Sequence, residues 1–159
     1  MIIKGLNETD FVNYQKASMF IIFPKCDFKC DKESGQDICQ NSSLINESDI
    51  YITAEDLAQR YVNNPMTSAV VCGGLEPMLS FDDIYYFLEV LRNDYDNHDD
   101  FVIYTGYNKD EIDEQIQKLK EFDHVIIKYG RFIPDSKSRY DRVLGVTLQS
   151  ENQYAERIS

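Results

Sequence analysis

The 159 residues of the chain match the usual size of one domain, so we expect one hydrophobic core and one main site. With 43% hydrophobic and 28% charged residues, the composition is that of a packed globular protein and excludes a disordered chain. A formal net charge of -12 without a basic stripe argues against nucleic acid and membrane as partners; the sequence also shows no leader or long apolar run, so we expect a soluble cytoplasmic protein.

The first half of the chain predicts a strand, a cysteine-rich loop, a helix and a second strand. Residues 18–23 form a short apolar, β-rich run that stops at Pro24, and the loop follows at once. Thr53 is a helix N-cap before an acidic first turn, and this helix ends at the turn 63–65. The apolar run 68–72 then predicts a buried strand.

The second half predicts further helices that alternate with strands. Apolar residues at helical spacing begin at Phe81, and an acidic stretch ends that helix. Asn108 caps another helix, with Lys118 and Lys120 near its negative end. Three more strands are expected at the apolar runs 101–104, 124–127 and 143–146.

Short strands separated by helices predict βαβ units and a mainly parallel sheet. We therefore expect an α/β fold, a single domain over residues 1–159 that forms a partial (βα) barrel with a curved sheet. Ligands of such folds gather at the carboxyl ends of the strands, and every unusual motif of this sequence falls at such an end.

The cysteines are the first of these motifs. Cys26, Cys30 and Cys39 lie close together in the chain, whereas Cys72 stands alone in an apolar run and is expected to be a buried strand residue. This spacing does not indicate a disulfide framework. Thiolates are ligands for zinc or for iron-sulfur clusters, and the pattern predicts one of these.

Three thiols are one short of a closed metal site. A structural zinc normally has four ligands, and no histidine of the chain lies near this loop in sequence. An incomplete cysteine set suits a 4Fe-4S cluster whose fourth iron is open to a ligand. The alternative is a zinc loop completed by Cys72 or by an acidic side chain.

Three other motifs follow predicted strands. In the segment 73–77 the paired glycines allow close backbone approach, and the carboxylate of Glu76 can accept hydrogen bonds from an ammonium group. The segment 104–107 offers hydroxyls and an aromatic face, while Lys128 and Arg131 can serve a ligand carboxylate. The plainer alternatives are a turn, half-buried packing tyrosines and a solvated surface, respectively.

These motifs, in this order, resemble the radical S-adenosylmethionine enzymes, and within them the anaerobic ribonucleotide reductase activating proteins. The resemblance covers almost the full chain. The CxxxCxxC loop of that family is similar to Cys26, Cys30 and Cys39, but eight residues separate the second and third cysteines where the family has two. Ile38 also stands where the family often has an aromatic neighbour.

The resemblance implies that these three cysteines hold a 4Fe-4S cluster and that other residues bind S-adenosylmethionine. The family's Gly-Gly-acid-Pro segment, which meets the methionine amino group, is similar to the segment 73–77, with Leu75 inserted. The family's closing Ser-Asn-Gln is similar to Ser150, Asn152 and Gln153. The cofactor-binding residues implied in this way are Asn41, Gly73, Gly74, Glu76, Pro77, Thr105, Tyr107 and Arg131.

The function that the resemblance implies is that of a small activase. It reductively cleaves S-adenosylmethionine to a 5'-deoxyadenosyl radical, which generates a glycyl radical on a larger partner enzyme such as anaerobic ribonucleotide reductase. The electron donor is expected to be a flavodoxin or ferredoxin, and no catalytic side chain is expected because the radical belongs to the cofactor. Two alternatives stay open: a 4Fe-4S electron-transfer module without this turnover, and a zinc-stabilised interaction protein.

Overall fold

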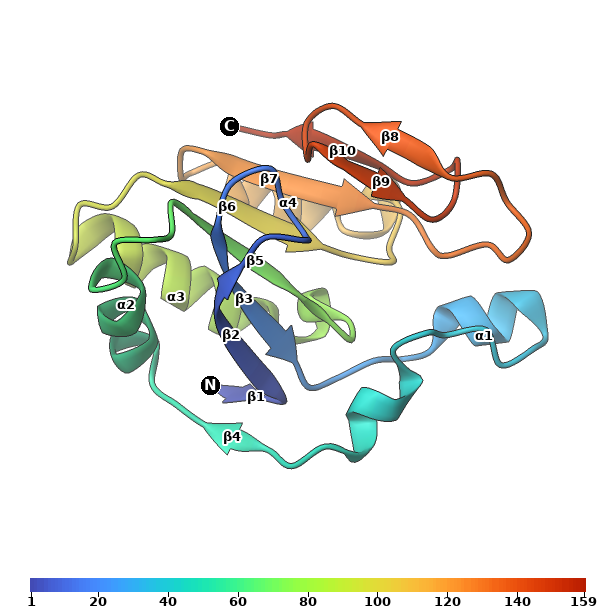
Figure 1. The fold of residues 1–159 in the computed structure, drawn as a ribbon, viewed down its shortest axis with the longest axis horizontal. Helices are drawn as coiled ribbons and strands as arrows, with labels where there is room; N and C mark the ends of the chain where they lie inside the picture. Colours follow the sequence, from blue (N-terminus) through green and yellow to red (C-terminus); the bar gives the residue numbers. More distant parts are fainter.

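The computed structural model describes residues 1–159, and its strands and helices alternate along most of the chain (Figure 1). The strands are β1 (Ile2–Ile3), β2 (Gly5–Asp10), β3 (Ser18–Phe23), β4 (Ile50–Tyr51), β5 (Ala69–Gly74), β6 (Asp100–Tyr104), β7 (Val125–Tyr129), β8 (Arg139–Asp141), β9 (Val146–Leu148) and β10 (Tyr154–Arg157). The α-helices are α1 (Lys29–Ser34), α2 (Ala54–Val62), α3 (Phe81–Asn93) and α4 (Asp113–Leu119), and the 3-10 helices are η1 (Ser42–Asn46), η2 (Pro77–Ser80) and η3 (Lys109–Glu111).

A six-stranded sheet in the order β10-β7-β6-β5-β3-β2 forms the centre of the fold. Its four central strands run parallel, and the two edge strands pair antiparallel to them. The edges β10 and β2 do not pair with each other, so the sheet is open, as a partial barrel requires. The predicted α/β fold with a mainly parallel sheet is confirmed.

The two faces of this sheet are covered in different ways, because successive side chains of a strand point to opposite faces. Residues such as Val70 and Cys72 belong to a large core cluster with α2, α3 and α4, which cover one face (Figure 1). Their neighbours Ala69 and Val71 belong to a smaller cluster on the other face. Residues of irregular segments, such as Tyr14 and Leu144, complete that second cluster, so no helix covers this face.

The helix ends follow the predicted capping chemistry. The Thr53 side chain accepts a hydrogen bond from the Asp56 N–H at 3.0 Å and starts α2. Asn108 and Glu111 form a capping box, although the first turn there is the 3-10 helix η3 and the α-helix begins only at Asp113. None of the helices is long and apolar enough to cross a membrane.

The strand predicted over 143–146 is wrong. The chain turns there, because the Asp141 side chain accepts the N–H groups of Val143 and Leu144 and because Gly145 has a positive φ of 71°. Val146 instead starts β9, which pairs only with β8 outside the central sheet. The main sheet gains β2 and β10, whose polar edge-strand sequences carry little apolar pattern.

Candidate functional site

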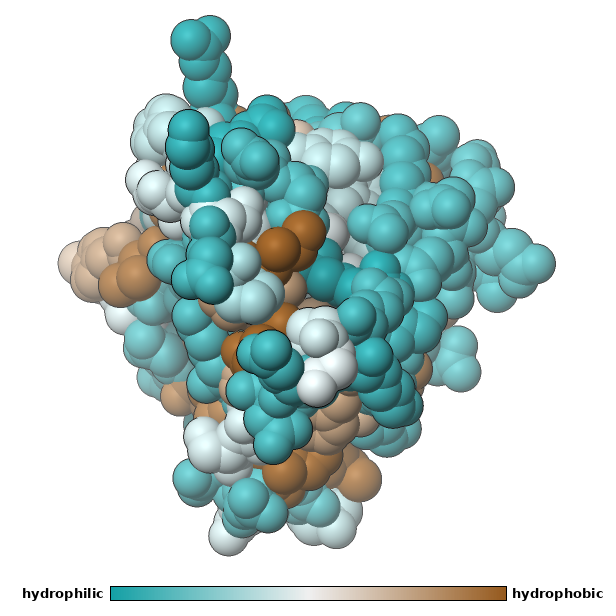
Figure 2. Space-filling view, turned by 90° about the vertical axis from the view of Figure 1, so that its right-hand side faces the viewer, coloured by the Kyte–Doolittle hydropathy of each residue, from teal (hydrophilic) through white to brown (hydrophobic).

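The carboxyl ends of β3, β5, β6 and β7 meet at one edge of the sheet, on the right of Figure 1, and a cavity of about 370 Å³ lies there. Figure 2 looks onto this end of the molecule, where hydrophobic side chains gather between hydrophilic ones. The cavity is lined by the three clustered cysteines and by residues at or beyond the carboxyl ends of these strands, including Asn41, Gly73, Gly74, Glu76, Thr105, Gly106, Lys128 and Gln153. Its volume lies within the range of small-molecule sites.

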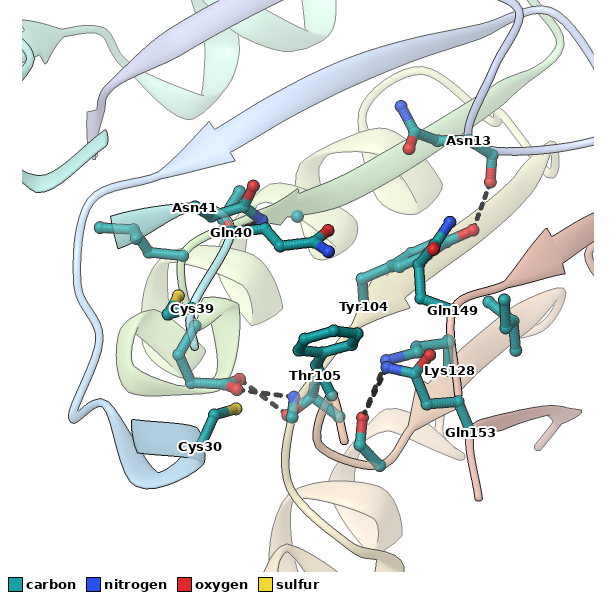
Figure 3. A pocket seen from close by; sticks show the side chains of 18 of the residues that line it. Asn13, Cys30, Cys39, Gln40, Asn41, Tyr104, Thr105, Lys128, Gln149 and Gln153 are labelled. Atoms are coloured by element: carbon teal, nitrogen blue, oxygen red, sulfur yellow. Dashed lines mark hydrogen bonds between the residues drawn. The ribbon is translucent and has the colours of Figure 1, made fainter. Parts of the chain in front are cut away.

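The cysteine loop brings three free thiols to this cavity. Cys26, Cys30 and Cys39 are half-buried and unpaired, and all three line it. The sulfurs of Cys30 and Cys39 lie on one side of the cavity in Figure 3, with Lys128 and Gln153 on the other. The donor set therefore fits a cluster held by three thiolates.

Hydrogen bonds tie both ends of the cysteine loop to the end of β5. The Glu76 N–H donates to the Lys25 carbonyl at 2.6 Å, on the side of the first cysteine. The Asn41 side-chain amide donates to the Gly74 carbonyl at 2.8 Å, on the side of the third. Asn41 thus joins the loop to the glycine pair.

Burial keeps the thiols of Cys26 and Cys30 protonated at neutral pH. It raises the pKa of Cys26 to about 11 and also raises the pKa of Cys30, against a smaller lowering by a backbone hydrogen bond from Phe132. Metal ligation requires the thiolate. Binding of metal at this loop must therefore release protons.

Cys72 is not available as a fourth ligand to this loop. It is fully buried in the large core cluster, it does not line the cavity, and burial raises the pKa of its thiol. The prediction that Cys72 is a buried strand residue is confirmed. Without Cys72 the zinc alternative lacks the cysteine that would have completed it. In addition, no three His, Cys, Asp or Glu side chains, those of the loop included, are grouped closely enough to hold a single metal ion.

Glu76 is buried, with 5% of its surface exposed, and its carboxylate is held in place by three hydrogen bonds. Oε1 accepts from the Thr105 hydroxyl at 2.7 Å (Figure 3). Oε1 also accepts from the Met78 N–H at 3.1 Å, and Oε2 accepts from the Gly106 N–H at 2.8 Å. Burial raises the pKa of Glu76, and these bonds oppose that rise. A carboxylate oxygen can accept two hydrogen bonds and Oε2 accepts only one here, so Glu76 retains capacity for a ligand donor.

The glycine pair is required by packing at the end of β5. A Cβ on Gly73 would lie 2.7 Å from the Phe20 ring, and Gly74 has a φ of 88° and lies against Ile22. Both glycines also line the cavity. Close packing on β3 therefore leaves no room for side chains where the backbone of β5 borders the cavity.

Three predicted cofactor-binding residues lie outside the cavity lining. Pro77 is buried at the start of η2. The Tyr107 hydroxyl donates to Asp27 at 2.8 Å, next to the first cysteine. Arg131 makes a bidentate pair with Glu111 at 2.8 and 2.6 Å and a further ion pair with Glu33 at 3.2 Å, so its contacts are with acidic side chains of the protein.

Lys128 is the cation that borders the cavity. The residue is 7% exposed, its ammonium group donates to the Gly130 carbonyl at 2.9 Å, and burial lowers the pKa of this lysine to about 8. Gln153 donates to the same carbonyl at 3.2 Å. A lysine inside the apolar run 125–129 is the sequence signal that marks this position.

Part of the cavity is formed by residues that the sequence did not indicate. They lie before β3, on β3 and after the third cysteine, and around β9, and they are Val12, Asn13, Phe20, Gln40, Val146, Thr147, Leu148 and Gln149. Their residue types are ordinary for loops and edges. Only the packing of these segments on the open face of the sheet brings them to the site.

Comparison with known proteins agrees with a 4Fe-4S cluster at the cysteine loop. A family model described as a 4Fe-4S single cluster domain matches residues 16–153, which include the three cysteines of the loop and the four parallel strands β3, β5, β6 and β7. No curated protein matches the chain significantly.

Proposed function

Because the chain belongs to the 4Fe-4S single cluster domain family, the radical S-adenosylmethionine domain typical of glycyl radical activases, we propose that it is a small activase of this kind. The observation that carries the proposal is the meeting of three free thiols, a buried carboxylate and a buried ammonium group at one cavity. A simple electron-transfer module needs the thiols alone. The additional charged groups and the room beside them favour a second, polar ligand.

Cys26, Cys30 and Cys39 would hold the cluster, which leaves one iron without a protein ligand. The chemistry that the cluster and S-adenosylmethionine supply when bound is one-electron cleavage of the latter to methionine and a 5'-deoxyadenosyl radical. The protein contributes binding, orientation and exclusion of water.

The charged residues of the cavity suit the methionine end of S-adenosylmethionine. The Glu76 carboxylate can accept from its ammonium group, and Thr105 and the Gly106 N–H keep that carboxylate in position. Lys128, on the opposite side of the cavity in Figure 3 from the cysteines, can pair with its carboxylate. Opposite charges on the protein would thus match both charges of the amino acid group.

The proposed substrate is a backbone glycine of a larger partner enzyme, such as anaerobic ribonucleotide reductase, and a flavodoxin or ferredoxin would supply the electron. The family type supports this choice. After incubation with the partner, S-adenosylmethionine and reductant, the partner should show the doublet of a glycyl radical in paramagnetic resonance. Absence of that signal with every glycyl radical enzyme of the source organism would contradict the partner proposal.

Anaerobic reconstitution with iron and sulfide tests the activity itself. The loaded protein should form 5'-deoxyadenosine and methionine with dithionite and S-adenosylmethionine, and S-adenosylmethionine should change the paramagnetic resonance signal of the reduced cluster. The matched controls are Cys39→Ser, which should lose the cluster, and Cys72→Ser, which should keep it. A cluster without 5'-deoxyadenosine would indicate the electron-transfer module, and zinc without acid-labile sulfide would indicate the zinc-stabilised protein.

A further inference from the structure

The spacer between Cys30 and Cys39 presents a geometric difficulty. Eight residues separate these cysteines, and yet both line the same cavity. A loop of this length that made no contacts of its own would leave Cys39 in many positions, and ordering it would cost conformational entropy. Some interaction within the spacer must bring its far end back.

One carboxylate does this. Oδ1 of Asp31, the residue that follows Cys30, accepts hydrogen bonds from the backbone N–H groups of Ile38 and Cys39, each at 2.8 Å. Hydrogen bonds from N–H groups to a carboxylate are shorter and stronger than those between neutral groups. The backbone of the third cysteine is therefore bonded directly to the neighbour of the second.

The residues between these two points also fold back on Asp31. Its backbone carbonyl accepts from the Gly35 N–H at 2.9 Å and from the Ser34 hydroxyl at 3.1 Å, which ends α1. Gly35 has a φ of 70°, a conformation in which glycine is favoured, so the chain can reverse there. The spacer is thus a single helical turn that returns to the residue from which it started.

We propose that Asp31 is the positioning residue for Cys39. By binding the backbone at Ile38 and Cys39, it holds the end of the long spacer near Cys30, so that the third thiol can reach the cluster. The role rests on the cluster binding proposed above. Asn41 complements it, because its bond to the Gly74 carbonyl holds the chain on the other side of Cys39. The third cysteine is then fixed from both directions.

Two substitutions of Asp31 test whether its side-chain acceptor oxygen is what positions Cys39. Asp31→Ala removes the acceptor, whereas Asp31→Asn keeps a side-chain oxygen that can accept both N–H groups. Asp37→Ala removes an exposed carboxylate of the same spacer and is the matched control. Far-UV circular dichroism and the thermal transition of each variant would show that the sheet and its helices are intact.

The first readout uses the protein without metal. Dibromobimane becomes fluorescent when it bridges two thiols, and peptide mapping identifies the bridged pairs. Bridging of Cys39 to Cys26 or Cys30 should fall about fivefold in Asp31→Ala, since two charge-assisted bonds are lost. It should fall less in Asp31→Asn, which keeps the acceptor without the charge, and should remain close to the wild-type value in Asp37→Ala. Equal bridging in all four proteins would overturn the proposal.

The second readout follows anaerobic reconstitution. In Asp31→Ala the iron and sulfide content should drop and loss of the cluster to a chelator should accelerate about fivefold, with a smaller effect in Asp31→Asn and none in Asp37→Ala. Equal retention in Asp31→Ala and wild type would also overturn the role of Asp31. If wild type took up no iron or sulfide, the proposed function would fail instead, and the bridging experiment would still decide whether Asp31 positions Cys39.

Discussion

At the residue scale, Lys128 is a site residue whose burial lowers the stability of the folded protein. Its ammonium group is almost fully buried, and the one hydrogen bond that it makes is to the Gly130 carbonyl. A buried charge without a close counter-ion destabilises the folded state. A ligand carboxylate in the cavity would relieve this cost.

Lys128→Met should therefore stabilise the protein without ligand while it weakens binding of S-adenosylmethionine. The pKa of Lys128 falls from 10.5 to about 8 on folding, so the penalty is fully present below pH 8 and decreases as the pH rises from 8 toward 10.5. We expect a gain of about 1–3 kcal/mol in the free energy of unfolding at pH 7 and a smaller gain at pH 10. Denaturant unfolding at both values, with exposed Lys137→Met as control, measures this; a gain that did not depend on pH would contradict it.

Cys72→Ser tests a residue that belongs to the core rather than to the site. Cys72 is fully buried among the apolar side chains of the large cluster, and a serine hydroxyl there would have to be buried as well. We expect the free energy of unfolding to fall by about 1–3 kcal/mol, while the iron and sulfide content after reconstitution stays that of wild type. Loss of the cluster would show that Cys72 acts at the site after all.

At the element scale, the helix that carries Cys30 is held by polar contacts, since α1 has no buried residue. Arg131 connects Glu33 of α1 to Glu111 of η3, and Lys29 makes a second ion pair with Glu111 at 3.0 Å. Tyr107 adds its bond to Asp27 just before the helix. Residues that follow β6 and β7, among them Tyr107 and Arg131, thus hold the cysteine loop in place.

Glu111→Gln should weaken these contacts. The hydrogen bonds from Arg131 are the main reason that the pKa of Glu111 falls from 4.5 to about 2. The stabilisation that the Glu111 carboxylate gives the fold is therefore present above pH 4.5 and is lost as the pH falls through 2. Because the side chain is 26% exposed, we expect a loss of only about 1–2 kcal/mol in the free energy of unfolding at pH 7.

Denaturant unfolding at pH 7 and near pH 2 measures this effect, and Asp110→Asn, an exposed neighbour, is the control. The difference in free energy of unfolding between Glu111→Gln and wild type should be smaller at the lower pH. Hydrogen exchange should also become faster in α1. An unchanged α1 would mean that the ion pairs do not hold the helix.

At the scale of the whole molecule, one end of the sheet carries the site and the other end carries contacts that stabilise the fold. The carboxyl ends carry the site, and the amino end of β6 carries Asp100, which is 3% exposed. Its carboxylate accepts from Tyr14 at 2.9 Å and pairs with Arg157 at 2.8 Å and Lys16 at 2.6 Å. It thereby connects the segment before β3 and the strand β10 to the centre of the sheet.

Asp100→Asn should destabilise the whole fold and leave the site intact. Burial opposes ionisation of Asp100, but the bonds from Lys16, Arg157 and Tyr14 outweigh it and hold the pKa at about 2. The free energy of unfolding should fall by about 2–4 kcal/mol at pH 7. This difference from wild type should disappear as the pH falls from about 4 through 2, because a carboxylate with a depressed pKa stabilises the fold only above that range. The thermal transition over this pH range measures it, with exposed Asp94→Asn as control; a loss that persisted at pH 2 would contradict the ionic origin.

The elements that could be predicted from sequence are those with local causes. Apolar runs predicted the central strands, and the caps at Thr53 and Asn108 predicted where two helical segments begin. The edge strands β2 and β10 escaped prediction, because their pairing with the sheet and not their polar sequences makes them strands. The turn at Gly145 was missed because the Asp141 side chain, and not the apolar run beside it, decides the backbone there.

The same division holds for the candidate site. By itself the sequence determined which chemistry is present: three thiols on one loop after a strand, a glycine pair with Glu76, and cations near the end of another strand. Only the tertiary structure decided that Lys128 borders the cavity while Arg131 pairs with Glu111, and that Asp31 returns Cys39 to the loop. The physical reason is that residue type and spacing are local properties, whereas the meeting of side chains from different strands depends on register, side-chain direction and the closing of loops.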